Sequence, residues 1–423
     1  MPWHGHSLPR FVPLQQRFPE TPPLHIDTTV RHGIQSMSGA IRPGMRIAVA
    51  VGSRGITRLQ EIVKSVLTQL QEAGAKPFIV PAMGSHGGAT ATGQIELLGE
   101  YGISESALGV PLNASMETTL LGSTPDHVPV HFSRAALEAD GIVLVNRVKP
   151  HTDFQGTLGS GLLKMMVVGL GKREGASTFH RASNRIGFEH MLRTVARVTL
   201  SKARILFGVA ILEDHAHQPA RIEMLRPEQM ESGEERLFKE AERLMPRLPF
   251  TDVDLLIVDC MGKNISGAGM DPNVIGRSVH GYSSLLKDRN ADRPAVRRLF
   301  VRELTPESHG NATGIGMADF TTTRLVESID REITTLNTLT AMTPQGVKIP
   351  IYFDTDKEAI DQALDTLALE DTGRARILRI QDTLSLEHLT ASEAYLEEIE
   401  RSERLEVSGP AFEMRFDEAG RMV

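Results

Sequence analysis

Hydrophobic and polar positions alternate in blocks along the first half of this sequence. Residues 46–52 form an apolar run that ends at glycine, which is typical of a buried strand. Apolar residues then recur at helical spacing from Leu59 to Ala73, which predicts a helix capped by Gly74. A second short apolar run follows at Pro77–Pro81. This order of strand, helix and strand predicts a right-handed βαβ unit and therefore a parallel sheet.

Similar blocks continue to the end of the chain. Further strands are predicted at 142–147 and 204–211, with an amphipathic helix at 187–201 between them and a charged helix at 227–247. In the second half the predicted strands are 254–259, 298–303, 348–353, 375–380 and 412–416, and the predicted helices are 321–335, 356–369 and 392–404. Prolines 246 and 249 close the charged helix, which favours a domain boundary near residue 248.

The sequence therefore predicts an α/β fold of two domains, at 1–248 and 249–423, with mainly parallel sheets. The last residues, from about 405 to 423, are a candidate for returning to the first domain. Because small ligands usually bind in clefts between domains, we expect an active-site cleft between the two.

Composition narrows the class of protein. The chain has 423 residues, of which 40% are hydrophobic and 23% charged, as expected of a globular protein with more than one core. A net charge of −7 argues against nucleic-acid binding, because no basic field would attract phosphates. No run approaches the roughly 18 apolar residues of a membrane helix, and the N-terminus lacks the apolar core of a secretory signal. The single cysteine, Cys260, excludes an intrachain disulfide and is predicted to be a buried thiol, so we expect a cytoplasmic protein.

Reactive side chains stand among glycines in four segments that follow or close predicted strands. The segments are Gly52–Arg58, Gly84–Thr90, Lys149–Lys164 and Gly169–His180. Open α/β folds bind their ligands at such strand ends. The first segment opens a helix, whose free backbone N–H groups favour a phosphate or carboxylate. Arg58 is then either a bidentate ligand for that anion or a simple surface residue.

Two histidines in these segments are candidates for acid–base catalysis. His86 is flanked by glycines, so little bulk separates its ring from a ligand, and an imidazole titrates near neutral pH. The alternative is a histidine that bonds local backbone in a tight turn. His151 follows Pro150, which fixes the chain as it leaves a strand, and its alternative is a surface-loop histidine.

Lys164 is the most distinctive residue of the sequence. It lies in the apolar run Leu162–Val168, and a lysine in apolar surroundings loses its charge easily and can act as a nucleophile. The alternative is a lysine whose amine reaches solvent from a buried strand. Further along, His180 stands at a predicted helix start, where a ring nitrogen could bind a transition metal.

Together these segments resemble the nickel-dependent lactate racemase family of 2-hydroxy acid racemases and epimerases. The resemblance rests on GSRGITR, GSHGG, KPH, SGLLK and the later His180, which occur in the family's order over most of the chain. Lys164 and His180 also keep the family's spacing.

The resemblance implies a cofactor and a role for each residue. The family uses a nickel pincer nucleotide, nickel pyridinium-3,5-bisthiocarboxylic acid mononucleotide. Lys164 would bind it covalently through a thioamide, and His180 would ligate the nickel. His86 and His151 would be the paired acid–base residues, and Arg58 would hold the substrate carboxylate. Further cofactor contacts are expected from Thr57, Ser85, Ser160 and Gly161. Cofactor-biosynthesis proteins would be the partners that load the enzyme.

The sequence also departs from the best-known lactate enzymes. The loop between His151 and Lys164 is longer than theirs, and Gly55 stands where an aspartate is usual. In the second domain, the region that would contact the substrate offers Lys263, Asn264 and Arg277. We therefore expect a 2-hydroxy acid larger or more polar than lactate, such as a sugar acid or a dicarboxylate.

Physical chemistry agrees with these roles. Removing a hydride from C2 yields a stable 2-keto acid, whereas removing a proton there would place a carbanion beside an ionised carboxylate. Each enantiomer presents its hydroxyl from a different direction, so two histidines are needed. Two alternatives stay open: a dehydrogenase or metal hydrolase on a similar scaffold, and a noncatalytic protein that binds the cofactor.

Overall fold

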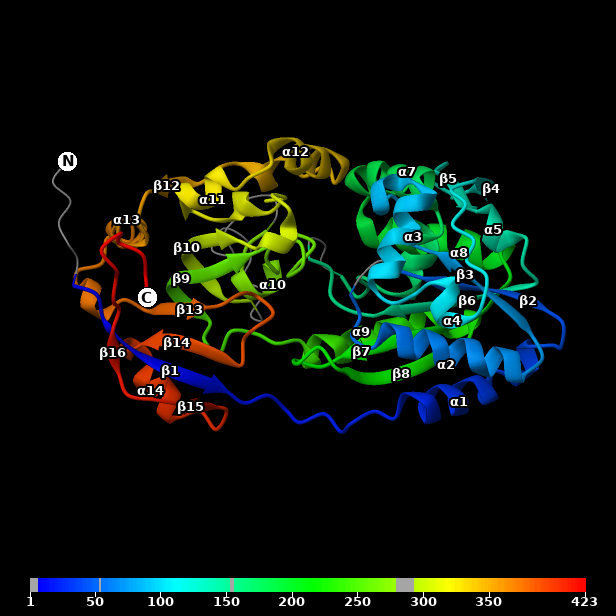
Figure 1. The fold of residues 1–423 in the computed structure, drawn as a ribbon, viewed down its shortest axis with the longest axis horizontal. Helices are drawn as coiled ribbons and strands as arrows, with labels where there is room; N and C mark the ends of the chain where they lie inside the picture. The colour runs from blue at the N-terminus through cyan, green and yellow to red at the C-terminus, as the bar shows by residue number, and fades with distance from the viewer. Residues whose placement is uncertain (1–6, 53–54, 153–155, 279–292) are drawn as a thin grey trace. The chain divides into compact units, whose positions relative to one another are not determined.

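The computed structural model describes residues 7–52, 55–152, 156–278 and 293–423, and its chain divides into two compact units. We call Glu20–Met245 the N-terminal unit, and Met1–Pro19 together with Pro246–Val423 the C-terminal unit. Each unit contains its own sheet (Figure 1).

The N-terminal unit is built on a five-stranded sheet with the order β3-β2-β6-β7-β8. The strands are β2 (Arg46–Val51), β3 (Lys76–Pro81), β6 (Gly141–Arg147), β7 (Ile205–Glu213) and β8 (Pro219–Leu225). Val49 of β2 pairs in parallel with Ile79 on one side and with Val143 on the other, and only β8 runs antiparallel to its neighbour. A separate hairpin joins β4 (Thr118–Ser123) and β5 (Pro129–Ser133).

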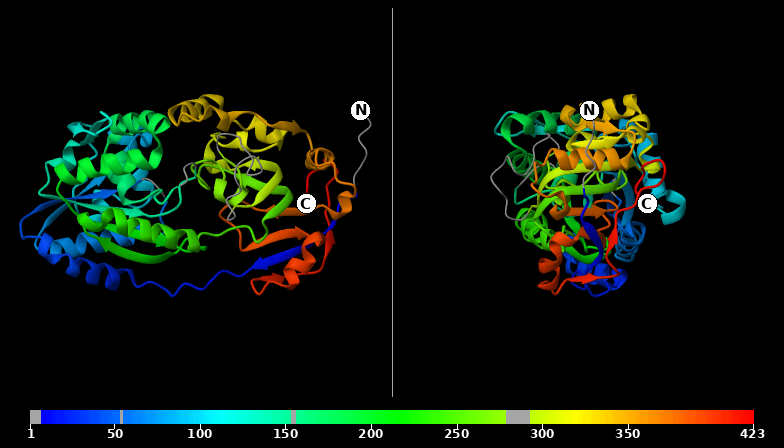
Figure 2. Two further views of the ribbon diagram at one scale, coloured as in Figure 1. Left: turned by 180° about the vertical axis from the view of Figure 1, so that it is seen from behind. Right: turned by 90° about the vertical axis from the view of Figure 1, so that its left-hand side faces the viewer.

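Helices cover both faces of this sheet, as the two views of Figure 2 show. The longer helices are α1 (Ile26–Ser36), α2 (Leu59–Glu72), α3 (Ala91–Glu100), α7 (Lys172–Ile186), α8 (Phe188–Lys202) and α9 (Met230–Leu244). Alternate residues of β2 belong to different cores, because successive side chains of a strand point to opposite faces. Val49 packs with the buried residues of α1 and α2, whereas Ala48 packs with those of α7, α8 and α9. The result is a three-layer α/β domain.

The C-terminal unit has a nine-stranded mixed sheet. Its order is β12 (Ile351–Phe353), β11 (Phe320–Thr322), β10 (Ala295–Leu304), β9 (Asp252–Met261), β13 (Ile377–Ile380), β14 (His388–Ser392), β1 (Arg10–Gln16) and β15 (Leu405–Val407), and β16 (Phe412–Glu413) also pairs with β1. The pairs from β12 to β13 are parallel, and those that involve β14 and β1 are antiparallel. The helices of this unit include α10 (Pro272–Ile275), α11 (Thr323–Glu327), α12 (Arg331–Thr340), α13 (Asp356–Asp365) and α14 (Leu396–Glu400).

The predicted α/β fold class is confirmed, and several details differ. Residues 10–16 fall within the predicted first domain, but they form β1, which pairs with β14, β15 and β16 in the C-terminal unit. The end of the chain therefore stays in its own unit and does not return to the first domain. The helix predicted at 321–335 begins as β11 and breaks between α11 and α12, where Asp330 caps the second helix. The helix predicted at 392–404 is only the short α14.

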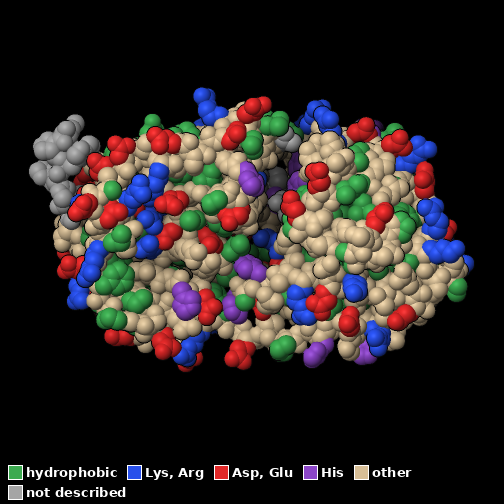
Figure 3. Space-filling view, in the orientation of Figure 1, with side chains coloured by type: hydrophobic (Ala, Val, Ile, Leu, Met, Phe, Trp, Pro, Cys, Tyr) green, Lys and Arg blue, Asp and Glu red, His purple; other side chains and the backbone are tan. Residues whose placement is uncertain are grey.

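Three further observations bear on the class of protein. No helix among the described residues is long and apolar enough to cross a membrane. Acidic and basic side chains are interspersed over the face seen in Figure 3. Cys260 lies on β9 and is half-buried, less buried than predicted, and burial raises the pKa of its thiol.

Candidate active site

The predicted site segments of the N-terminal unit gather at the carboxyl edge of its parallel sheet. The chain leaves β2 for β3 on one side, and the next strand, β6, joins β2 on the other side. This reversal is the topological switch point at which open α/β sheets bind ligands. Gly52, directly after β2, lies close to both Asn146 of β6 and Met165: a Cβ at Gly52 would be 3.3 Å from Asn146 Oδ1 and 3.2 Å from Met165 Cε.

Lys164 and His151 are in direct contact. Lys164 ends the short helix α6 (Leu162–Lys164), which continues into a π-helical turn at Met165–Gly169. Its Nζ lies 2.6 Å from Nε2 of His151 and 5.7 Å from the ring centroid of Phe188. The His151 ring lies 5.1 Å from the same phenyl ring. Both polar side chains are half-buried, so the amine and the imidazole share a partly enclosed, partly apolar environment.

His180 is connected to the same phenyl ring through Phe179. It lies in the middle of α7, and not at the helix start as predicted. Its ring is 5.8 Å from Phe179, whose own ring meets Phe188 at 5.5 Å. Burial, together with the nearby charge of Lys164, lowers the pKa of His180 to about 4. The imidazole is therefore neutral at physiological pH, which is the form that can ligate a metal.

A buried carboxyl group that sequence reasoning missed supports this segment. Glu234 of α9 is fully buried and accepts a hydrogen bond from the Leu163 amide at 2.9 Å. A Cβ at Gly161 would overlap the Glu234 carboxyl group, so Gly161 is needed for this approach whether or not it contacts a cofactor. Burial raises the pKa of Glu234 to about 7. The neighbouring Ser160 exchanges two backbone hydrogen bonds with Lys149, which closes the long loop.

The loop that carries His86 packs against the end of the π-helical turn. The Gly84 amide donates to the Gly169 carbonyl at 3.0 Å, and a Cβ at Gly84 would be 3.2 Å from the Val168 carbonyl oxygen. Three glycines of the loop adopt positive φ, including Gly87 at 63°. The structure thus brings the His86 loop to the segment that carries Lys164, and the His86 side chain is exposed to solvent.

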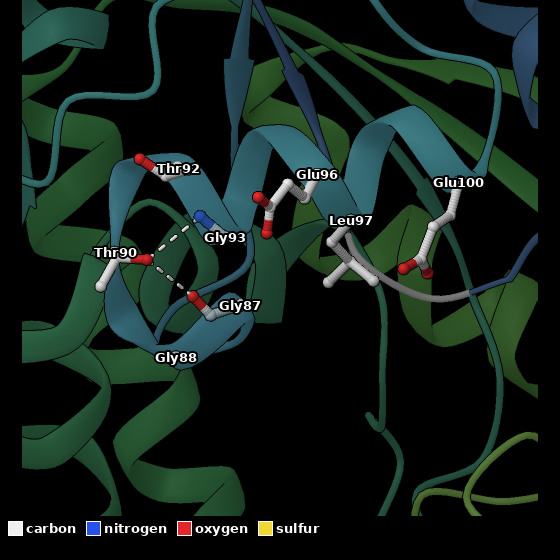
Figure 4. Close-up of a pocket in the computed structure, with 8 residues that line it drawn as sticks. All are labelled: Gly87, Gly88, Thr90, Thr92, Gly93, Glu96, Leu97 and Glu100. Atoms are coloured by element: carbon white, nitrogen blue, oxygen red, sulfur yellow. Dashed lines mark hydrogen bonds between the residues drawn. The ribbon is translucent and has the colours of Figure 1, made fainter. Parts of the chain in front are cut away.

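A shallow pocket of about 460 Å³ lies beside this loop, at the start of α3 (Figure 4). It is lined by Gly87, Gly88, Thr90, Thr92, Gly93, Glu96, Leu97 and Glu100. Thr90 caps the helix: its hydroxyl oxygen accepts from the Gly93 amide at 3.0 Å and donates to the Gly87 carbonyl at 3.1 Å. The pocket therefore joins the glycine-rich loop to a helix start.

In the GSRGITR segment, Thr57 and Arg58 form hydrogen bonds with carboxylates of this unit. Arg58 adopts a φ of 58°, is exposed, and forms two hydrogen bonds with Glu61 at 2.7 and 2.6 Å. The Thr57 amide donates to Glu213 at 2.9 Å, and Arg147 pairs with the same carboxylate. Bidentate binding of a substrate carboxylate through Nε and Nη2 of Arg58 would therefore require the guanidinium to leave Glu61.

The remaining substrate candidates lie in the C-terminal unit. Lys263 donates through Nζ to the Gly267 carbonyl at 2.6 Å, and Asn264 accepts from Thr305 at 2.7 Å. Arg277 is buried, and its guanidinium is bonded to Asp319 at 2.6 Å and to two backbone carbonyls. These bonds hold the Arg277 guanidinium in this unit, and a contact between Arg277 and the substrate stays a prediction.

Among the described residues, no three His, Cys, Asp or Glu side chains form a cluster able to hold a metal ion. The family model described as the lactate racemase N-terminal domain matches residues 17–187. Over this range the chain is lactate racemase-like. The predicted resemblance to the lactate racemase family is thereby confirmed for residues 17–187.

Comparisons with solved and curated proteins give two further findings. The structure of the lactate racemase apoprotein from Thermoanaerobacterium thermosaccharolyticum is 12% identical and covers 91% of this chain and 86% of its own, with a TM-score of 0.48. No curated protein matches the chain.

Proposed function

We propose that this protein is a racemase or epimerase that inverts C2 of a 2-hydroxy acid, with a nickel pincer nucleotide tethered to Lys164. The reaction would be proton-coupled hydride transfer through a 2-keto acid. The observation that carries the proposal is the contact between Lys164 and His151 beside a neutral His180, in a lactate racemase-like domain.

The residues around Lys164 suit this group. A lysine must lose its proton before it can form a thioamide, and His151 Nε2, 2.6 Å away, is placed to accept that proton. His180 presents an unprotonated ring nitrogen, which is a good donor for nickel. When bound, the group would supply an acceptor that takes a hydride from C2 and returns it to the opposite face.

Side chains of the protein itself carry out the proton transfers and bind the substrate. During oxidation, the hydride carries two electrons away from C2, and one imidazole takes the hydroxyl proton. During reduction, the other imidazole returns a proton to the carbonyl oxygen, so that His86 and His151 serve opposite enantiomers. We assign Arg58, Lys263, Asn264 and Arg277 to the substrate, and Thr57, Ser85, Ser160 and Gly161 to the cofactor. We also propose that the enzyme works in the cytoplasm, where cofactor-biosynthesis proteins load it.

Inversion of enantiopure substrates tests the proposal. Enzyme from cells that make the cofactor is incubated with 2-hydroxy acids of increasing size and polarity, deuterated at C2, and the products are separated by chiral chromatography. We expect inversion with deuterium retained at C2. His86→Ala and His151→Ala should each lower the rate by about 10²–10⁴, the usual contribution of an acid–base group. His190→Ala, an exposed histidine paired with Asp126 in the same unit, is the matched control.

Two results would contradict the proposal in different ways. Turnover that requires free nicotinamide nucleotide or zinc would indicate a dehydrogenase or a metal hydrolase. A loaded protein that inverts none of the acids, and in which neither histidine variant changes any activity, would indicate a noncatalytic cofactor-binding protein.

A further inference from the structure

Two fully buried polar side chains of the N-terminal unit have no part in the chemistry proposed above. Lys172, the first residue of α7, and Gln94 of α3 both have 0% exposure, so neither can contact a substrate. Lys172 also adopts a φ of 54°, a backbone conformation that is unfavourable for a residue with a side chain. Burial lowers the pKa of its amine to about 8. Such a group is stable in the interior only when hydrogen bonds compensate for lost hydration.

The hydrogen bonds of these two side chains lead to His86. Lys172 Nζ donates to the Pro81 carbonyl at 2.7 Å, where β3 ends, and to Gln94 Oε1 at 3.4 Å. Gln94 Nε2 in turn donates to the carbonyls of Gly84 at 3.0 Å and of His86 at 3.3 Å. The two side chains therefore connect the end of β3 with the backbone on both sides of the histidine.

The loop itself needs such support. Gly84, Gly87, Gly88 and Ala89 all have positive φ, so four of its six residues from 84 to 89 lie in the left-handed region. Glycines in this region lose much conformational freedom on folding, and an alanine there is strained. Interior hydrogen bonds to the loop carbonyls hold this conformation in place.

We propose that Lys172 and Gln94 are positioning residues that fix the His86 loop and tie it to α7, the helix that carries His180. The inference rests on the proposed function only in assigning His86 an acid–base role. We call the hydrogen bonds of Lys172 and Gln94 the network. Its loss should leave the contact between Lys164 and His151 in place and impair the acid–base step that depends on His86.

Three substitutions separate the parts of the network. Gln94→Leu removes both donors to the loop and the acceptor for Lys172. Gln94→Glu keeps an acceptor for Lys172 but loses both donors, and it keeps the test available if the leucine variant does not fold. Lys172→Met fills the space of the lysine without its hydrogen bonds. Gln69→Leu, at a buried glutamine of α2 bonded to Glu72, is the matched control.

The first readout is hydrogen–deuterium exchange in protein that lacks the cofactor. We expect amides in residues 83–93 to exchange about tenfold faster or more in Gln94→Leu, Gln94→Glu and Lys172→Met, and those in β6 to stay unchanged. The control should match the unsubstituted protein. Unchanged exchange in residues 83–93 would overturn the proposal, whatever the enzyme turns out to catalyse.

The second readout is single-turnover oxidation of each enantiomer by loaded enzyme, with the 2-keto acid measured after acid quench. His86→Ala identifies the enantiomer that depends on His86. The three network variants should slow that enantiomer by about 10–10², as expected for a misplaced catalytic group, and change the other by less than about twofold. Equal slowing of both enantiomers would assign the network to general stability and overturn the positioning role. Absence of inversion in the unsubstituted enzyme would instead contradict the proposed function, and the exchange result would still decide whether the network holds the loop.

Discussion

The ionisation of Glu234 should make the N-terminal unit less stable at neutral pH than at mildly acidic pH. Burial raises the pKa of this carboxyl group from 4.5 to about 7 in the folded protein, against the opposing effect of the Leu163 and Leu162 amides. Between these two pH values the folded state binds more protons than the unfolded state, so the free energy of unfolding falls as pH rises. The pKa difference corresponds to a change of about 3 kcal/mol in the free energy of unfolding, of which about 2.5 kcal/mol is expected between pH 5 and pH 8.

Urea denaturation followed by circular dichroism at pH 5 and pH 8 tests this magnitude. Glu234→Gln cannot ionise, so its stability relative to the unsubstituted protein should improve by about 2–3 kcal/mol from pH 5 to pH 8. Glu231→Gln, on the same helix, is the control. Burial tends to raise the pKa of Glu231, but hydrogen bonds from Arg197 and Arg193 lower it overall, so its relative stability should not change over this range. A Glu234→Gln difference that is the same at both pH values would refute the reasoning.

Three further predictions concern packing and charge. Gly161→Ala should destabilise the unit by about 1–3 kcal/mol, because its Cβ would overlap the Glu234 carboxyl group, and thermal unfolding will show whether it does. Burial lowers the pKa of Lys172 from 10.5 to about 8, so the unfolded state binds more protons than the folded state between these pH values. The free energy of unfolding of the unsubstituted protein therefore rises as pH increases over this range. Lys172→Met lacks this effect, so its free energy of unfolding should fall by about 3 kcal/mol relative to the unsubstituted protein from pH 8 to pH 10.5, as measured by denaturant titration. In the C-terminal unit, Asp356→Ala should cost about 3–5 kcal/mol, because the buried carboxylate binds Arg302 at 2.8 Å and Arg324 at 2.5 Å; an unchanged urea midpoint would contradict this.

Local sequence pattern was sufficient to predict the four parallel strands of the N-terminal unit, β2, β3, β6 and β7, but not β8 or the β4–β5 hairpin. Apolar runs marked β2, which ends in glycine, and β6, and the order of strand, helix and strand implied that β2 and β3 are parallel. His151, Lys164 and His180 could be predicted to lie near one another because all three follow β6 and precede β7 in the sequence. The contact between Lys164 and His151 itself could not be predicted, because the loop between them has no regular pattern.

The supporting residues were missed for a physical reason. Glu234 lies in a charged helical stretch that is typical of a solvated face, and its partner Leu163 is 71 residues away. Gln94 and Lys172 are likewise polar residues of amphipathic helices, and only tertiary structure shows that they are buried. Strand β1 carries no signal for the sheet that it joins, because its partners lie near the other end of the chain.

Mass spectrometry of the loaded protein tests the central claim, that Lys164 carries the cofactor, most directly. Trypsin does not cleave after a modified lysine, so an adduct on Lys164 should appear as a peptide spanning 148–172 with added mass, at one nickel per chain in native spectra. Active protein that yields only the unmodified peptides 148–164 and 165–172 would contradict the account.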